Sequence, residues 1–428
     1  MADPAADVLV QIGDDELLAG RLWSHRRRNT QSATFAYDAG YLASPVAYEL
    51  DPALPLVAGQ QQTPAGRAIF GAFSDCAPDR WGRRLINCAE ERRVRDEGSG
   101  AARSFGEIDY VLGVRDDLRQ GALRFRAPQT GTYLARERSG VPHLLELSEL
   151  LGASERLERD EATAAELQVL LRGGSSLGGA RPKAHVLDAD GRIAIAKFPS
   201  VAADEWDVIR WEHVAQRLAR NAGIRTPHST LHLVDGKPVL VVDRFDRSSS
   251  RRVGYVSAMT MLEATDGDEG SYVDIAGVIE EHSPAASADL RELWRRVAFS
   301  ILIRNTDDHL RNHGFLREST AGWALSPAFD LNPDPRPGPK HLSTAIDGDI
   351  TEARIDVLVD VADVFRLRER DARSVLGEVT GAVTRWSEVA ADVGLEGVET
   401  DRMARAFEHD ELERARQLAA GAASVRER

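Results

Sequence analysis

The first third of the chain alternates short apolar segments with turn residues. VLVQIGDDELLAGRLW predicts a β-hairpin that turns at Gly13-Asp14-Asp15, and ATFAYD predicts a further strand. Residues 63–93 carry an apolar series that Pro78 interrupts, which is typical of a helical insert. We therefore expect a small, mainly β domain at residues 1–125, followed by a polar, Gly- and Pro-bearing linker at residues 126–142.

Helices and strands mix in residues 143–250. A helical stretch ends at Gly173-Gly174, and RIAIAKF then alternates with period two, which places Ile193, Ile195 and Lys197 on one face of a strand. WDVIRWEHVAQRLARNAGI repeats apolar residues at helical spacing. PVLVVDRF is a continuous apolar run and predicts a buried strand.

Residues 251–428 are mainly helical in pattern. LWRRVAFSILIRN predicts a core helix that runs directly into NTDDHLRNH. GFLRE and WALSPAFD predict a hairpin whose second strand ends at Asp330. The tail from about residue 353 has the pattern of amphipathic helices.

Composition narrows the function classes. The formal charge of −14 argues against a protein that binds nucleic acid over its whole surface, because phosphate binding needs a basic face. The two cysteines are too few for a structural zinc site and suit a reducing compartment. The sequence has no apolar run of about 18 residues and no secretory pattern, so we expect a cytoplasmic protein without a membrane contact.

The residues that phosphoryl transfer requires follow one another along the chain. The reaction needs a cation for the nucleotide phosphates, oxygen ligands for Mg²⁺ and a carboxylate that orients the attacking hydroxyl. Lys197 on its strand supplies the cation, and Glu212 on the next helix can pair with it. Asp307 and Asn312 have the spacing D-x-x-x-x-N, which lets one loop provide the base and an amide oxygen. Asp330 is then a second oxygen ligand for Mg²⁺.

Five strings, in order, resemble the C-terminal kinase-like region of HipA proteins: SSLGGARPKA, IAKFPS, VVDRFDR, NTDDHLRNHGFL and SPAFDLNP. The first hundred-odd residues are similar to the smaller N-terminal HipA domain, so the resemblance spans about residues 8–350. It implies an α+β fold in which the small β domain precedes a two-lobed protein-kinase-like region. The nucleotide-binding lobe would be residues 143–250, and the mainly helical lobe would be residues 251–428.

The resemblance also implies an ATP- and Mg²⁺-dependent serine/threonine-protein kinase, the toxin of a toxin–antitoxin pair. Asp307 would be the catalytic base, Asn312 and Asp330 the Mg²⁺ ligands, and Lys197 the lysine that contacts ATP phosphates. His309 would hold the catalytic loop in shape. The remaining nucleotide-binding residues would be Ser176, Gly178, Gly179 and Lys183 of the glycine-rich loop and Asp243, Phe245 and Asp246 of the hinge. Asp243 occupies a position where HipA sequences often have glutamate. Any role that requires the longer glutamate side chain is therefore not implied for Asp243.

A serine of the glycine-rich loop can be phosphorylated in this family, which would expel the loop and silence the enzyme. Ser176 is the first candidate and Ser175 the second; alternatively, the serine only caps or turns the chain. The partners that the resemblance implies are a protein substrate that is a component of translation and a small helix-turn-helix antitoxin. Through this antitoxin the protein would contact DNA only indirectly.

Other functions fit parts of the sequence. GSSLG has the G-x-S-x-G pattern of hydrolases with Ser176 as nucleophile, but the segment before it is helical in pattern rather than a strand. His309 and His313 could suggest a metal hydrolase, although no HExxH motif is present. An aminoglycoside-type small-molecule phosphotransferase and a co-repressor that binds the antitoxin remain open alternatives.

Overall fold

A computed structural model describes residues 5–420 except 28–29, 99, 136–139, 175–178, 180 and 249–250. The chain forms two compact units. Unit 1 comprises Met1–Ala203, His232–Val256 and Leu316–Thr320, and unit 2 comprises Asp204–Leu231, Ser257–Phe315 and Ala321–Arg428. Among the described helices, none is long and apolar enough to cross a membrane.

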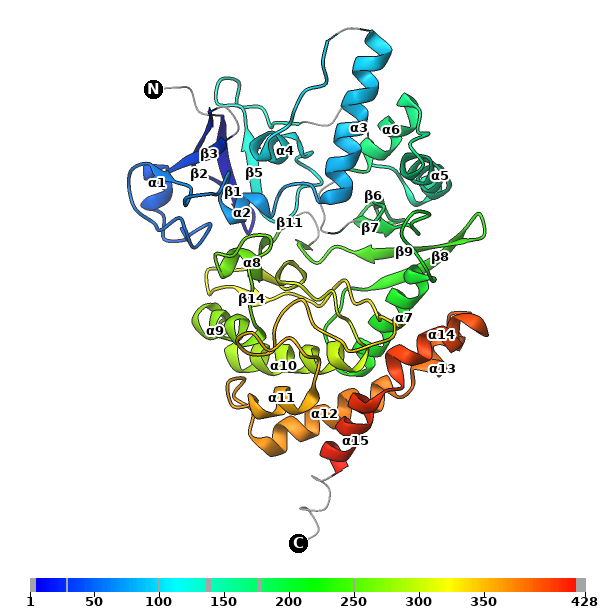
Figure 1. Cartoon of the computed structure of the whole chain (residues 1–428). Helices are drawn as coiled ribbons and strands as arrows, with labels where there is room; N and C mark the ends of the chain where they lie inside the picture. The colour runs from blue at the N-terminus through cyan, green and yellow to red at the C-terminus, as the bar shows by residue number, and fades with distance from the viewer. Residues whose placement is uncertain are drawn as a thin grey trace. The chain divides into compact units, whose positions relative to one another are not determined.

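Unit 1 begins with a five-stranded sheet in the order β4-β3-β2-β1-β5 (Figure 1). The predicted hairpin is confirmed, because Ile12 pairs with Asp15 across the turn. Three phenylalanines, Phe35, Phe73 and Phe125, meet edge to face and fill the core beside this sheet. The strands are β1 (Ala6–Ile12), β2 (Asp15–Arg27), β3 (Thr30–Tyr37), β4 (Gln61–Gln62) and β5 (Leu123–Arg126).

A second part of unit 1 packs three helices near a four-stranded sheet in the order β6-β7-β9-β8. Helix α3 begins directly after Pro78, where Asp79 caps it by accepting from Gly82 N at 2.6 Å. Trp81 and Leu85 of this helix join one apolar core with residues of the other two helices and of the sheet. The elements are α3 (Arg80–Glu97), α5 (Leu147–Glu158), α6 (Ala164–Arg172), β6 (Lys183–Leu187), β7 (Ile193–Lys197), β8 (Ser229–Val234) and β9 (Lys237–Asp243).

Short elements complete unit 1 around these two sheets. They are α1 (Ala39–Leu42), α2 (Gly71–Ser74), α4 (Glu107–Gly113), η1 (Leu144–Glu146), β10 (Arg247–Ser248) and β11 (Arg251–Arg252). The division between the units falls within three strands, which are β8, β12 (Gly254–Ser257) and β13 (Gly314–Arg317).

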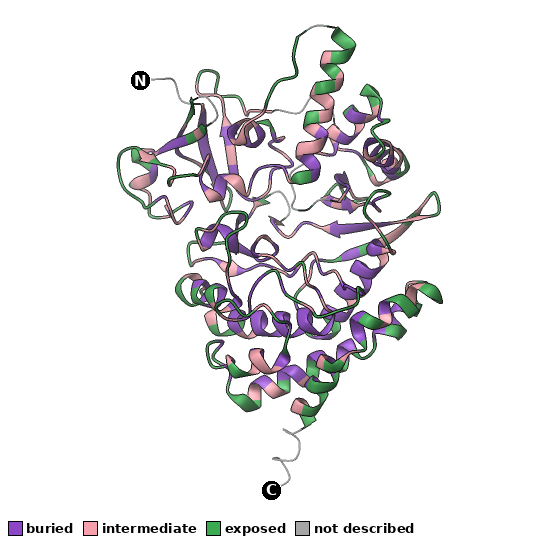
Figure 2. Cartoon of the chain, in the orientation of Figure 1, coloured by how far each residue is buried: buried purple, intermediate pink, exposed green. Residues whose placement is uncertain are grey.

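Unit 2 is helical and is organised by α10 (Ala286–Leu302), which is buried along most of its length (Figure 2). The core helix expected from LWRRVAFSILIRN is therefore confirmed. Along the chain, α9 (Tyr272–His282) precedes α10, and η2 (Leu310–Asn312) follows it. The other elements are α7 (Val208–Asn221), α8 (Ala258–Met261), β14 (Ala324–Leu325), α11 (Ile355–Asp360), α12 (Glu369–Val383), α13 (Trp386–Asp392), α14 (Val398–Phe407) and α15 (Asp410–Ala420).

Candidate active site

The segment that carries Asp307 begins where the buried helix α10 ends. The chain turns at Arg304, whose φ of +55° lies in the left-handed region, and Asn305 N donates back to Ser300 O at 2.8 Å. Asn305 itself is fully buried. Because a rigid core helix fixes its start, the following loop has a defined position. It exposes Asp307 and buries the next residue, Asp308.

Asp308 anchors this loop to the core of unit 2. Its Oδ2 accepts from Tyr272 Oη at 2.7 Å and from Ser300 Oγ at 3.0 Å. His313 Nε2 lies 3.1 Å from its Oδ1, without the alignment of a hydrogen bond. Burial raises the pKa of Asp308, but His313 and the hydroxyl donors outweigh it and lower that pKa below its ordinary value. The carboxylate is therefore held charged in the core.

The sequence interpretation did not assign Asp308, Tyr272 or Ser300. The two adjacent carboxylates have different environments, since Asp307 is exposed and Asp308 is buried. The sequence does contain a signal for the buried position of Asp308. His313 occurs in the same motif, and a histidine beside a buried segment is a suitable partner for a carboxylate. Its contact with Asp308 gives His313 a structural role in the core of unit 2.

Asn312 lies buried at the end of η2 and folds back onto the loop. Its Nδ2 donates to Asp307 O at 3.0 Å. Since the amide nitrogen is used in this way, the amide oxygen Oδ1 is the atom left to act as a metal ligand. His309 precedes η2, and its backbone accepts from Asn312 N at 2.8 Å. Within the described part of the chain, His309 Nδ1 is buried without a hydrogen-bond partner.

Asp330 does not end a strand, so the expected position was wrong. β14 stops at Leu325, and residues 326–335 have no regular secondary structure. Pro327 cannot donate to a strand partner, and Ala328 N donates to Arg225 O at 2.7 Å, which takes the chain away from the sheet. Asp330 has a φ of +58°, a left-handed conformation that is uncommon for a residue with a side chain.

Hydrogen bonds join the Asp307 and Asp330 segments. Asn332 N donates to Asn305 Oδ1 at 3.3 Å, and Thr306 Oγ1 donates to Asp334 Oδ2 at 3.3 Å. Asp334 is held in turn by Lys340 Nζ at 2.9 Å. Unit 2 therefore brings together the two segments that the sequence analysis combined into one site.

Lys197 and Glu212 belong to different units. Lys197 is the last residue of β7, where it pairs with Leu240 of β9 and lies half-buried on the face opposite Ala194 and Ala196. The alternation expected for this strand is confirmed. Glu212 is buried on α7, where its Oε1 accepts from Gln216 Nε2 at 3.1 Å. Their pairing stays a prediction.

Ser175, Ser176 and Gly178 of the glycine-rich loop lie outside the described residues. Gly179 has a φ of +124°, and a Cβ there would come within 2.6 Å of Lys183 Nζ, so the backbone and the lysine approach closely. Lys183 forms a buried ion pair with Asp79, Nζ to Oδ2 at 2.8 Å. Burial raises the pKa of Asp79 and the lysine lowers it, with a net rise.

The hinge residues Asp243, Phe245 and Asp246 have distinct surroundings in unit 1. Asp243 ends β9 opposite Ala194, and Phe245 packs against Val253 and Tyr255. Asp246 is buried and accepts hydrogen bonds from Arg244, Arg247 and Gly121 N. Its carboxylate has about as many donors as it has lone pairs, so we leave it out of the nucleotide site proposed below.

Comparisons with known proteins agree with this description. The fold matches a structure of the Shewanella oneidensis MR-1 toxin–antitoxin system HipA, HipB and its operator DNA, with a TM-score of 0.59. The match is 16% identical and covers 98% of this chain and 96% of that chain, so it shows the fold. The predicted α+β fold class, with a β-rich N-terminal part and a helical C-terminal part of kinase-like type, is confirmed.

Two curated relatives align over short stretches. "Putative kinase" of Haemophilus influenzae is 28% identical over 135 residues, and "Putative kinase Y4dM" of Sinorhizobium fredii is 31% identical over 137 residues. Each alignment covers 28% of this chain, and they span 39% and 32% of the relatives' own lengths.

The fold is that of an α+β protein with a β-rich N-terminal part and a helical C-terminal part. Its family is given by residues 175–386, which match the family model described as HipA-like C-terminal domain. This part of the chain is therefore a HipA-like C-terminal domain, and the resemblance noted in the sequence is confirmed.

Proposed function

We propose that the chain is an ATP- and Mg²⁺-dependent serine/threonine-protein kinase that acts as the toxin of a toxin–antitoxin pair. The observation that carries the proposal lies in unit 2, where Asn332 N and Asn305 Oδ1 join the segments of Asp307 and Asp330. The two names of curated kinases and the HipA-like domain support the same reaction class.

Each residue has a physical role in this proposal. Asp307 is an exposed carboxylate on a loop that buried Asp308 fixes, so it can accept the proton of a substrate hydroxyl and orient its oxygen toward the γ-phosphate. Lys197 of β7 would pair with the ATP phosphates, and His309 would hold the turn into η2. Positioning and charge stabilisation supply most of the rate in phosphoryl transfer, so a rigid loop is the main requirement.

The donor set fits magnesium. Asn312 Oδ1 and the Asp330 carboxylate are hard oxygen ligands, and Mg²⁺ at a nucleotide typically takes one or two protein ligands beside phosphate and water. When bound, Mg²⁺ would neutralise charge on the transferred phosphate.

The reaction is tested directly by incubating the purified chain with γ-labelled ATP and Mg²⁺, and mapping labelled residues by mass spectrometry. Label on a serine or threonine of an added protein, or of the chain itself, is the expected result. Label on Ser176 or Ser175 would also support regulation by autophosphorylation. Transfer to an aminoglycoside but to no protein would replace this proposal by the small-molecule phosphotransferase.

Asp330→Ala is expected to weaken binding of ATP in the presence of Mg²⁺ about tenfold to a hundredfold, because it removes a charged metal ligand. Titration calorimetry with a non-hydrolysable ATP analogue measures this affinity with and without Mg²⁺. In EDTA the variant and the wild type should bind the analogue equally. A loss of the same size in EDTA would contradict the role of Asp330 as a metal ligand.

The proposal of a toxin role is supported by the matched HipA structure, which is a complex with HipB and operator DNA of a toxin–antitoxin system. We therefore expect that production of the chain slows cell growth and that a small helix-turn-helix antitoxin, which contacts DNA in its place, relieves the effect. Asp307→Ala should not slow growth when it is produced to the same level. Growth inhibition by both versions would point instead to a binding protein such as a co-repressor.

A further inference from the structure

Unit 1 contains a pocket whose lining is positively charged although the chain as a whole is acidic. The pocket has a volume of about 360 Å³, within the range of small-molecule sites. Four arginines and one glutamate line it, which gives a formal charge of 4 − 1 = +3 against −14 for the chain. The charged residues are Arg247, Arg251, Arg252, Arg317 and Glu318.

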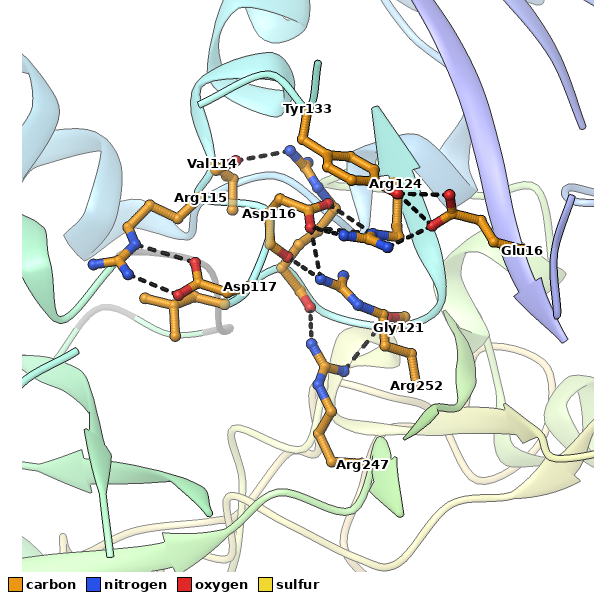
Figure 3. Close-up of polar contacts among 12 residues, drawn as sticks. Glu16, Val114, Arg115, Asp116, Asp117, Gly121, Arg124, Tyr133, Arg247 and Arg252 are labelled. Atoms are coloured by element: carbon orange, nitrogen blue, oxygen red, sulfur yellow. Dashed lines mark hydrogen bonds and ion pairs between the residues drawn. The ribbon is translucent and has the colours of Figure 1, made fainter. Parts of the chain in front are cut away.

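Arg247 and Arg252 of the lining belong to a network in which guanidinium groups outnumber carboxylates (Figure 3). Asp116 lies between two of them, with Arg124 Nη2 at 2.5 Å and Arg252 Nη2 at 3.0 Å. Asp246 is similarly shared by Arg244 and Arg247. The network also includes Glu16, which pairs with Arg124, and Arg119, which donates to backbone carbonyls. It therefore has five cations and three anions, an excess of 5 − 3 = +2. The cations are Arg119, Arg124, Arg244, Arg247 and Arg252, and the anions are Glu16, Asp116 and Asp246.

Such an excess is costly in the interior unless an anion offsets it. The side chains of Arg252, Arg247 and Arg244 are only 8%, 13% and 1% exposed. Burial, with the charge of Arg244 beside it, lowers the pKa of Arg247 to about 9, and burial also lowers the pKa of Arg252. Both groups would be stabilised as cations by a negative ligand.

One donor in the lining has no partner. Arg252 Nη2 reaches Asp116, but Arg252 Nη1 is buried and makes no hydrogen bond among the described residues. A planar guanidinium with one nitrogen occupied and the other unsatisfied can donate to a phosphate oxygen. Hydroxyls of Ser248, Ser319 and Thr320 also line the pocket, and they are further donors for the same group.

The pocket also has two aromatic residues in its lining. Tyr48 and Phe245 line it, and the guanidinium of Arg317 lies 4.2 Å from the centre of the Tyr48 ring. The lining contains none of the residues assigned to ATP phosphates or Mg²⁺, and Phe245 is the only residue shared with the candidate nucleotide site. The lining therefore combines guanidinium groups that can bind an anion with aromatic side chains that can contact an apolar group.

We propose that this pocket binds a phosphate monoester whose phosphoryl group contacts Arg252 and Arg247 and whose organic part rests on Tyr48 and Phe245. The ligand is defined by this chemistry: two negative charges in a small tetrahedral group, attached to a flat apolar group. Neither arginine proposed here to contact the phosphoryl group is assigned to phosphoryl transfer, and the proposal does not depend on kinase activity.

The probes are inorganic phosphate, phenyl phosphate and phenol, each titrated by calorimetry into the full chain at constant ionic strength. Phenyl phosphate should bind more tightly than inorganic phosphate, and phenol should bind at least about tenfold more weakly than phenyl phosphate. Equal binding of phenol and phenyl phosphate would show an apolar pocket only. No binding of either phosphate at millimolar concentration would overturn the proposal.

Arg252→Gln should weaken phenyl phosphate binding about tenfold. Arg124→Gln is its matched control, since Arg124 shares the same carboxylate of Asp116 but does not line the pocket. The control should lose stability in a similar way and keep its phosphate affinity within about twofold. Equal affinity losses in both variants would mean that the network matters for folding alone.

A second variant covers the case in which Arg252→Gln does not fold. Arg251 lines the pocket, is 53% exposed and pairs with Asp14, so Arg251→Gln should fold normally. It should weaken phenyl phosphate binding about threefold. Binding of a non-hydrolysable ATP analogue should be unchanged in all three variants, and a parallel loss of ATP binding would assign the pocket to the nucleotide instead.

Discussion

Asp307→Ala is expected to reduce transfer of the γ-phosphate about 1000-fold, while ATP still binds. The side chain is exposed, so its removal leaves no cavity and no buried group without a partner. The loop keeps its anchor, because Asp308 and its hydroxyl donors are untouched. Steady-state assays with labelled ATP measure the rate, and calorimetry with an ATP analogue measures the affinity.

The matched control for this substitution is Asp307→Asn, which keeps the size of the side chain but not its charge. If Asp307 accepts a proton, the asparagine variant should be nearly as slow as the alanine variant. If the residue only positions the hydroxyl through a hydrogen bond, asparagine should retain much of the rate. Full activity of both variants would remove Asp307 from the proposed chemistry.

Helices and strands could be predicted from the sequence where the local pattern of apolar and turn residues determines them. The hairpin of β1 and β2 follows from alternation and a glycine turn, and α10 follows from an apolar stripe at helical spacing. In these segments the residues that form the core also form the pattern. The strand expected up to Asp330 failed, because Ala328 N donates to Arg225 O, a backbone partner about a hundred residues away in the sequence.

The candidate site was predictable only in part for the same reason. Motif spacing identified Asp307, Asn312 and Asp330, and unit 2 joins their segments. The spacing could not show which aspartate of the pair is buried, since Tyr272 lies 36 residues away from Asp308. Nor could it show that Lys183 pairs with Asp79, 104 residues earlier, or that Asp246 accepts from Gly121 N, 125 residues earlier.

The two adjacent aspartates should therefore differ in how strongly their substitution by alanine changes the free energy of unfolding. Asp307→Ala should change the free energy of unfolding by no more than about 0.5 kcal/mol, as is usual for an exposed side chain. Asp308→Ala should lower it by about 3 kcal/mol, because it leaves His313 buried without its carboxylate neighbour and two hydroxyls without their acceptor. Urea unfolding followed by tryptophan fluorescence measures both changes.

Tyr272→Phe separates this anchoring role from a general effect of a core mutation. It removes one hydroxyl and keeps the aromatic ring, which packs edge-on against His313 with 5.5 Å between the two ring centres. We expect a loss of about 1 kcal/mol, smaller than that of Asp308→Ala, with the rate of phosphate transfer lowered in step with the loosening of the loop. Unchanged stability in both Asp308→Ala and Tyr272→Phe would mean that another contact holds Asp307 in place, and the loop would lose its proposed anchor.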